Sequence, residues 1–153
     1  MQAFSHSDNL ILAVIGAGIE SMGANVFSSA LRKVTMKAAV PPESGDTFFG
    51  LDINTVYVPA ASVELYKTAD KFSFYEKFIT AMPSVTFNSQ GGSEIPSIID
   101  IPYGMTIKEP ASPTYEFYTF EGWYLEAECQ NRFEFQTAVI TENITLYANW
   151  LSF

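Results

Sequence analysis

The sequence is short of the residues that most enzymes use for nucleophilic and metal chemistry. Its 153 residues include one cysteine, Cys129, and one histidine, His6. A single cysteine excludes an internal disulfide and a cysteine-rich zinc site. Cys129 follows Glu126 and Glu128, and acidic surroundings raise the pKa of a thiol rather than lowering it. Because His6 falls in a different predicted domain, we expect no Cys–His pair, no catalytic residue and no metal site.

Basic residues are scarce as well. The chain has 8 lysines and arginines against 17 aspartates and glutamates, which gives a net charge of −9. Most of the acidic excess lies in residues 82–153, where Lys108 and Arg132 face nine acidic residues. Phosphate backbones are bound by clustered lysine and arginine. We therefore expect neither nucleic acid nor an anionic membrane surface as a partner.

Long apolar runs are absent too. No apolar stretch approaches the roughly 18 residues that a membrane-spanning helix needs, and the N-terminus lacks the basic region and apolar run of a secretion signal. Met1 leads directly into Gln2-Ala3-Phe4, which is already the middle of a recurring pattern. We expect a fragment of a longer protein, with no direct membrane insertion in this part and with any signal or anchor outside it.

Two short motifs suggest enzymatic chemistry, but each lacks a required partner. Gly16-Ala17-Gly18 follows an aliphatic stretch, as in dinucleotide-binding folds, yet Ser21 stands where the third glycine is needed. Glu126 and Glu128 are neighbouring carboxylates, whereas glycoside hydrolysis needs two carboxyl groups opposed across a cleft. The sequence predicts no cofactor and no enzyme.

What the first half does contain is a pattern at a fixed distance. An aromatic residue, a polar gap and an aliphatic stripe recur around Phe4, Phe27 and Phe49, and the last two copies are offset by 22 residues throughout. A period of roughly 20 to 29 residues with such a stripe is typical of leucine-rich repeats. The pattern predicts a short solenoid fragment over residues 1–81. Its last part, residues 59–80, would be a C-terminal cap with a helix that begins at Ser62.

This half resembles the BspA-type leucine-rich repeats of bacterial surface proteins. The most specific part of the resemblance is the phrase Val56-Tyr57-Val58-Pro59-Ala60-Ala61-Ser62-Val63-Glu64-Leu65-Tyr66-Lys67. The resemblance implies that the solenoid offers an elongated binding surface, used for adhesion or for interaction with host proteins.

Residues 82–153 follow a different pattern, with a period of two. Val85-Thr86-Phe87 alternates like a half-buried strand, and further strands are predicted over 98–101, 119–124 and 144–150. In the last of these, alternate residues share one face (Ile144, Leu146, Ala148 and Trp150) and the others share the opposite face (Thr145, Tyr147 and Asn149).

This second half is similar to the internalin-type B repeat, also called the Listeria–Bacteroides repeat. The similarity rests on Gly91-Gly92-Ser93, on Tyr118-Thr119-Phe120-Glu121-Gly122-Trp123-Tyr124 and on Ile144-Thr145-Leu146-Tyr147-Ala148-Asn149-Trp150. It implies a small β-grasp-like module found in secreted or wall-attached proteins. Phe117 stands where that family usually has glycine, so we expect a different local turn here.

The expected protein is α+β, mainly β: a leucine-rich-repeat solenoid end with its cap over residues 1–81, then a β-grasp-like module over 82–153. We expect a non-catalytic bacterial protein at the cell surface or outside the cell, for adhesion or protein–protein interaction. Its partners would be extracellular proteins or glycans, with the second module as a spacer or auxiliary contact. Tyr124 and Tyr147 are candidate ligand-contact aromatics, whereas Trp123 and Trp150 are expected in the core. A purely structural stalk, or a carbohydrate-binding module that uses exposed aromatics, are the alternatives.

Overall fold

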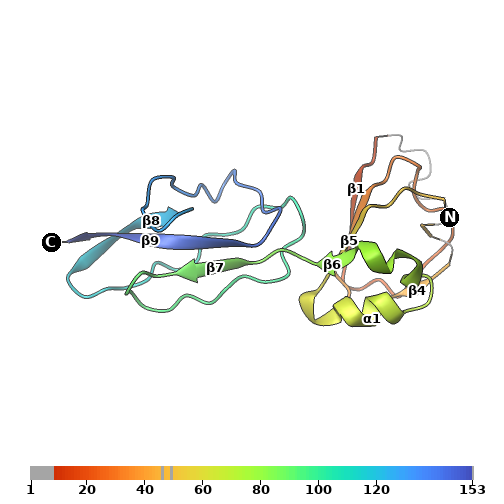
Figure 1. Cartoon of the computed structure of the whole chain (residues 1–153), viewed down its shortest axis with the longest axis horizontal. Coiled ribbons are helices and arrows are strands. Elements are labelled where there is room, and N and C mark those ends of the chain that lie inside the picture. The colour runs from red at the N-terminus through yellow and green to blue at the C-terminus, as the bar shows by residue number, and fades with distance from the viewer. Residues whose placement is uncertain (1–8, 46, 49, 153) are drawn as a thin grey trace. The chain divides into compact units, whose positions relative to one another are not determined.

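A computed structural model describes residues 9–45, 47–48 and 50–152, so Phe4, His6 and Phe49 lie outside the described residues. The chain divides into two compact units, Met1–Met82 and Pro83–Phe153 (Figure 1). Each unit has its own hydrophobic core. Within the described residues, no helix is long and apolar enough to cross a membrane.

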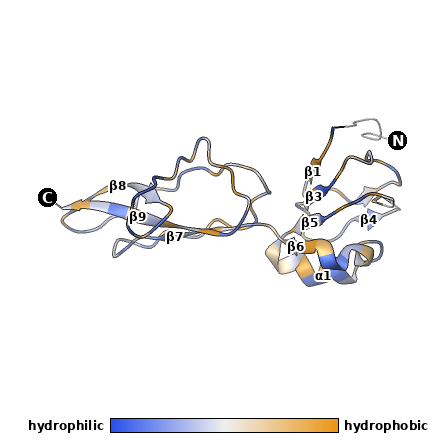
Figure 2. Ribbon diagram, turned by 45° about the horizontal axis from the view of Figure 1, so that its top comes forward, coloured by the Kyte–Doolittle hydropathy of each residue, from blue (hydrophilic) through white to orange (hydrophobic). Residues whose placement is uncertain are grey.

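The first unit is built on parallel strands. Its main sheet contains β1 (Leu12–Ile15), β3 (Lys33–Met36), β5 (Thr55–Val58) and β6 (Ile79–Ala81), in the order β1-β3-β5-β6. A second, two-stranded sheet pairs β2 (Ser21–Met22) with β4 (Glu43–Ser44). The residues of β1 are all hydrophobic (Figure 2).

The prediction of a leucine-rich-repeat solenoid over residues 1–81 is wrong. The unit is a small arrangement of sheets with few helices, and its sheets are not solenoid-like. The offset of 22 residues has a simpler cause, because β3 and β5 pair in parallel with Val34 opposite Val56. A constant offset fixes the register of neighbouring strands, but it does not fix how many units stack.

The segment expected to be a solenoid cap is instead the connection to the last strand. After β5 the chain forms the 3-10 helix η1 (Ala60–Ser62), the α-helix α1 (Val63–Thr68) and a second 3-10 helix, η2 (Ser73–Phe78). It then returns to the sheet as β6, which pairs in parallel with β5.

Helix α1 is held to the segment that follows β3 by two buried side chains. Ser62 occupies the N-cap position, but its hydroxyl makes no capping bond; it donates to the carbonyl oxygen of Ala39 at 2.7 Å. The hydroxyl of Tyr66, which is fully buried, donates to the carbonyl oxygen of Ala38 at 2.9 Å. These two bonds satisfy adjacent carbonyl groups of the segment that follows β3.

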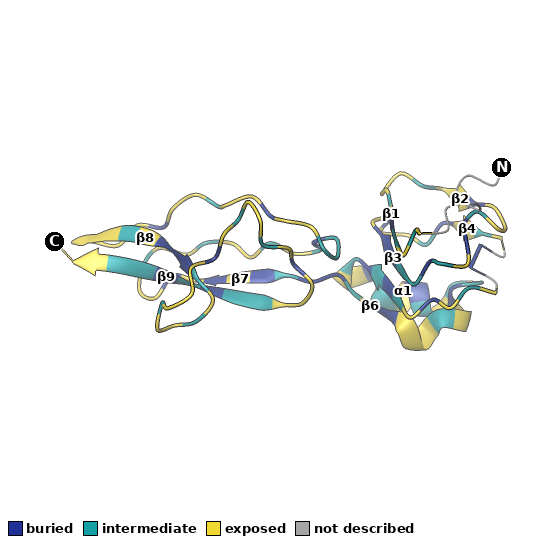
Figure 3. Cartoon of the chain, turned by 90° about the horizontal axis from the view of Figure 1, so that it is seen from above, coloured by how far each residue is buried: buried dark blue, intermediate teal, exposed yellow. Residues whose placement is uncertain are grey.

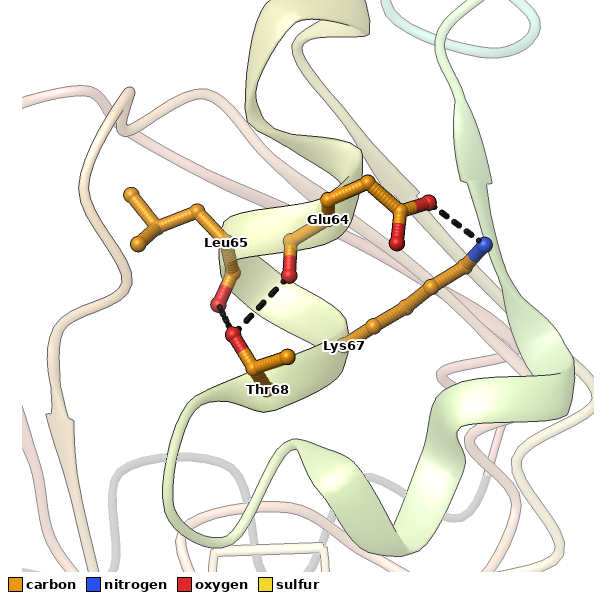
Figure 4. A network of polar contacts seen from close by, with 4 residues as sticks. All are labelled: Glu64, Leu65, Lys67 and Thr68. Atoms are coloured by element: carbon orange, nitrogen blue, oxygen red, sulfur yellow. Dashed lines mark hydrogen bonds and ion pairs between the residues drawn. The ribbon is translucent and has the colours of Figure 1, made fainter.

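The polar contacts on the exposed side of α1 contribute less. Lys67 pairs with Glu64 at 2.9 Å, and the Thr68 hydroxyl donates to the carbonyl oxygen of Glu64 at 3.0 Å (Figure 4). A pair three residues apart on a helix surface stabilises the helix by about 0.2–0.5 kcal/mol. The helix is therefore positioned mainly by Ser62 and Tyr66.

The core of the first unit combines aliphatic side chains of the strands with a row of aromatic rings. Phe27 stacks on Phe48 with ring centroids 5.9 Å apart, and Phe48 meets Phe72 edge to face at 6.0 Å. Phe72 also packs against Tyr66, at 5.0 Å. Such contacts add about 0.5–1.5 kcal/mol each to the burial of the rings. The rings thus connect the loops before the strands to α1.

We predict that the first unit loses stability in alkali through Tyr66. Burial raises the pKa of Tyr66 from 10.0 to about 12, so the folded state favours the protonated phenol. This contribution is complete below pH 10 and is lost as the pH rises towards 12. The Tyr66→Phe variant cannot ionise here. Urea unfolding followed by far-UV circular dichroism should show a steeper loss between these pH values for the native chain than for the variant.

The same variant gives a second reading at neutral pH. Tyr66→Phe leaves the buried carbonyl of Ala38 without its donor, which should cost about 1–3 kcal/mol in the free energy of unfolding. Equal alkaline slopes for the two proteins would contradict the assignment to Tyr66, because the two proteins differ only in whether residue 66 can ionise.

The second unit is a mixed three-stranded sheet. Its strands are β7 (Val85–Asn88), β8 (Tyr118–Tyr124) and β9 (Ile144–Ser152), and β9 lies in the middle, parallel to β7 and antiparallel to β8. The strand expected over 98–101 is reduced to an isolated bridge between Ile98 and Val85. The expected β-grasp-like fold also needs correction, since the described part of this unit contains no helix.

The alternation predicted for β9 is confirmed. Leu146 and Ala148 are fully buried, and Ile144 and Trp150 pack against the same core. Trp123, on β8, is 1% exposed and meets Phe87 at 4.8 Å. Both tryptophans are thus part of the core, as expected.

Phe117 corrects the expectation of a different turn. Its φ is +67°, the left-handed region that glycine adopts without strain. The backbone N–H of Tyr118 donates to the carbonyl oxygen of Tyr115 at 3.1 Å and closes the turn around it. The turn has therefore kept a glycine-type conformation with a bulky residue in it.

Gly92 marks a second tight point, and here we predict strong sensitivity to substitution. A Cβ on Gly92 would collide with the ring of Trp150 and lie 3.1 Å from the carbonyl oxygen of Thr114. The ring cannot easily move away, because its Nε1 donates to the carbonyl oxygen of Ser89 at 2.9 Å and the ring packs against Phe120 with centroids 5.5 Å apart. Gly92→Ala should lower the free energy of unfolding by about 1–3 kcal/mol.

Tryptophan fluorescence during urea unfolding measures this effect specifically, because both tryptophans lie in the second unit. Gly18→Ala is the control, since a Cβ there meets nothing within 4 Å. A Gly92→Ala midpoint equal to that of the control would show that Trp150 can be displaced freely.

Candidate binding face

Three side chains form a row across the sheet of the second unit. Tyr147, on the central strand β9, is opposite Tyr124 of β8 and opposite Asn88 of β7. Residues directly opposite in an antiparallel pair have Cβ atoms about 4.5–5.5 Å apart. We call Asn88, Tyr147 and Tyr124 the tyrosine row, and the sheet face that carries it the outer face.

The row faces away from the core because side chains alternate along a strand. Tyr124 follows the buried Trp123, and Tyr147 lies between the buried Leu146 and Ala148. Both tyrosines are half-buried and Asn88 is exposed. The structure therefore brings the two candidate ligand-contact aromatics together as cross-strand neighbours.

The row continues towards the far end of β9 with a polar pair. The side-chain amide of Asn149 donates to the carboxylate of Glu121 at 2.7 Å. Glu121 is the extra residue of a β-bulge, because Phe120 pairs with Trp150 while Gly122 pairs with Asn149. The bulge lets an exposed carboxylate reach Asn149 without entering the core.

Gln90 links its own loop to β9 and to the loop that contains Ala127, beside the tyrosine row. The side-chain amide of Gln90 donates to the carbonyl oxygen of Ala148 at 2.8 Å and lies 3.3 Å from that of Ala127. It also lies 3.5 Å from the sulfur of Cys129. A shallow depression borders this glutamine and the exposed edge of β7, lined by Thr86, Asn88, Gln90, Gly92, Glu94 and Thr145.

Cys129 is not poised as a nucleophile. Burial raises the pKa of its thiol, and the nearby carboxylates of Glu126, Glu128 and Glu121 raise it further, against a hydrogen bond from Gln90 that lowers it. A protonated thiol is a poor nucleophile. The effect of the acidic surroundings agrees with the prediction from the sequence.

Glu126 stabilises its own loop through hydrogen bonds to Asn131. One carboxylate oxygen accepts hydrogen bonds from the backbone N–H and the side-chain amide of Asn131. Glu126 and Glu128 thus belong to one loop rather than to opposite sides of a cleft. Among the described residues, no group of three or more histidine, cysteine, aspartate and glutamate side chains could hold a metal ion.

The tyrosine row consists of two aromatic residues and one amide residue. Tyr124 and Tyr147 are cross-strand neighbours on the outer face, and each offers an amphipathic ring with a hydroxyl group. The sequence places Asn149 on the same face as Tyr147, and the structure confirms this. The sequence could not show that Asn88 lies beside Tyr147. That placement depends on the parallel register between β7 and β9, which the alternation of either strand does not specify.

Comparison with known proteins agrees with one of the two resemblances. Residues 84–149 match the Listeria–Bacteroides repeat domain. This range covers all of β7 and β8 and most of β9, and so includes the tyrosine row. Nothing in the comparisons supports a BspA-type leucine-rich-repeat region.

Two curated relatives extend the similarity beyond that domain. A protein of Evansella cellulosilytica named "Putative membrane protein" is 37% identical over 112 residues, which is 72% of this chain and 17% of the relative. A "Putative Gly-rich membrane protein" of the same organism is 32% identical over 112 residues, 72% of this chain and 13% of that protein. The second unit has only 71 residues (153 − 82), so both matches include part of the first unit.

We predict a measurable coupling between the two tyrosines of the row. A double-mutant cycle with Tyr124→Ala and Tyr147→Ala should give an interaction energy of about 0.2–1 kcal/mol, as expected for directly opposed cross-strand residues. Urea unfolding followed by tryptophan fluorescence supplies the four free energies. The matched control is the cycle of Tyr124→Ala with Thr86→Ala, which lies two strands away on β7 and should be additive. Additivity of the tyrosine pair would mean that the rings do not touch.

Proposed function

We propose that this chain is part of a bacterial protein at the cell surface or associated with the membrane, where it makes non-catalytic contacts with extracellular proteins. The proposal rests on the tyrosine row: two tyrosines and an asparagine lie side by side on a sheet face. Within the described residues, no helix or second sheet of this unit covers that face.

Tyrosines on a rigid strand suit protein recognition. They have only two side-chain torsions to fix, and they offer apolar area together with a hydroxyl group. The hydroxyl groups of the two tyrosines can exchange hydrogen bonds with a partner backbone. The acidic excess of the second unit, two basic residues against nine acidic ones, favours a partner surface that carries positive charge.

The location is supported by the comparisons. Residues 84–149 match the Listeria–Bacteroides repeat domain, and the resemblance to that family implies a secreted or wall-attached protein. Both relatives carry "membrane protein" in their names. The chain spans less than one fifth of either relative. The role proposed here is therefore that of a module within a larger protein.

Arrays of extracellular-matrix proteins and mucins test the function. The whole chain should bind at least one protein on the array, and the Tyr124→Ser/Tyr147→Ser variant should lose at least about tenfold in affinity, or about 1.4 kcal/mol. Phe74→Ser is the control, because Phe74 is an exposed aromatic of the first unit. An antibody against the chain should label intact cells that produce the complete protein.

Three results would count against the proposal. The chain could fail to bind every protein on the array, or the double variant could bind as well as the native chain. Binding only to mucin glycans, abolished by removing the glycans, would favour the carbohydrate-binding alternative.

A further inference from the structure

Trp123 carries a polar atom that its surroundings leave unpaired. The residue lies in the buried stretch of β8, dark blue in Figure 3, and is 1% exposed. Its Nε1 is buried and has no hydrogen-bond partner among the described residues. An indole N–H can only donate, and a buried donor without an acceptor is costly in free energy. By contrast, Nε1 of Trp150 donates to the carbonyl oxygen of Ser89 at 2.9 Å.

Trp123 also lines a small polar pocket. The pocket has a volume of about 190 Å³, which corresponds to about six water molecules at roughly 30 Å³ each. Elsewhere the indole is surrounded by the hydrophobic core, where Phe87 and Phe120 pack against it. An acceptor for Nε1 must therefore enter through this pocket. Besides Trp123, its aromatic lining is Phe133 and Phe135, and its polar lining is Glu109, Arg132, Glu134 and Gln136.

The backbone fixes Arg132 beside Trp123. Tyr124 and Arg132 form an isolated antiparallel bridge, and the backbone N–H of Phe133 donates to the carbonyl oxygen of Trp123 at 2.8 Å. Gly122 leaves room for the arginine, because a Cβ there would lie 3.0 Å from its Nε. None of the four polar side chains of the lining makes a hydrogen bond or an ion pair with a described residue. The pocket thus presents one buried donor and four polar groups that are free to bind.

This lining selects a neutral ligand with hydroxyl groups. The carboxylates of Glu109 and Glu134 outnumber the guanidinium group of Arg132 and repel an anion. A cationic amine has no acceptor for the indole N–H of Trp123. A hydroxyl group both accepts and donates, so it can pair with the indole and with a carboxylate. The half-buried ring of Phe135 offers an apolar surface for the C–H groups of the same ligand.

We propose that this pocket binds one ring of a neutral pyranose sugar, with one hydroxyl group accepting the hydrogen bond of Trp123 Nε1. Further hydroxyl groups pair with Arg132, Gln136 and the two carboxylates. Because the pocket is smaller than the roughly 300–1,000 Å³ of pockets for drug-sized ligands, a single ring enters. A sugar hydroxyl that replaces a water molecule at Nε1 keeps the hydrogen bond. The site shares no residue with the tyrosine row and does not depend on the proposed protein contact.

Heteronuclear NMR of the isotope-labelled whole chain tests the proposal at the atom concerned. The sequence contains two tryptophans, Trp123 and Trp150, so the spectrum contains two indole N–H signals. The probes are the methyl pyranosides of glucose, galactose, mannose and N-acetylglucosamine, each added up to about 10 mM, which is about tenfold above a dissociation constant of about 1 mM. At least one probe should move the Trp123 signal in a saturable way. The Trp150 signal should stay in place, because its Nε1 keeps the carbonyl oxygen of Ser89.

Two substitutions in the pocket are matched by one outside it. Arg132→Ala and Glu134→Ala each remove a charged hydrogen-bonding group, and each should weaken sugar binding about tenfold. Glu128→Ala removes an exposed carboxylate that does not line the pocket and should bind the sugar like the native chain. The Tyr124→Ser/Tyr147→Ser variant should also bind the sugar like the native chain, so failure of the proposed protein contact is distinguishable from failure of this site.

An unchanged Trp150 signal shows that each variant is folded. The proposal is overturned if no probe moves the Trp123 signal, if both indole signals move alike, or if Glu128→Ala weakens binding as much as Glu134→Ala. A further probe, N-acetylalanine methylamide, represents a neutral peptide backbone. Movement of the Trp123 signal with this amide, but with no sugar, would assign the pocket to a peptide and would also overturn the proposal.

Discussion

The position of β9 between β7 and β8 is the constraint on which the second unit depends. A central strand has neighbours on both sides, so its alternation decides what each face of the sheet can be. Leu146, Ala148 and Trp150 point to the core, where they meet Trp123 and Phe87 from the two flanking strands. Because side chains alternate along the strand, Tyr147 must lie on the opposite, outer face of the sheet. The alternation of side chains along β9 therefore determines both the core and the candidate binding face.

The alternation of buried and outward-facing side chains along β9 could be predicted from the sequence, because hydrophobic and polar residues over 144–150 repeat with a period of two. The cross-strand neighbours of each residue could not be predicted in this way. Tyr124 and Tyr147 become partners only through the antiparallel register of β8 and β9, which includes a bulge at Glu121. Asn88 joins them through a parallel pairing between strands far apart in the chain. Register depends on long-range packing and turn geometry, and composition alone does not specify it.

The first unit shows how a correct observation can lead to a wrong fold. The offset of 22 residues is real and reappears as the register of β3 against β5. What holds the unit together is less visible in the sequence: Ser62 and Tyr66 donate to the carbonyl groups of Ala39 and Ala38. Ser62 was a reasonable N-cap by residue type. Its hydroxyl found a tertiary acceptor instead, and nothing local in the sequence could distinguish these outcomes.

Charge explains why aromatic contacts matter so much in the second unit. The described ion pairs, Arg32 with Asp52 and Lys67 with Glu64, both lie in the first unit and are partly exposed, so each contributes at most about 1 kcal/mol. The second unit, with two basic residues against nine acidic ones, has no described ion pair to offset its self-repulsion.

Ring contacts of Trp123 and Trp150 with Phe120, at 5.4 and 5.5 Å, oppose that repulsion from within. The same acidic excess repels other copies of the chain at long range.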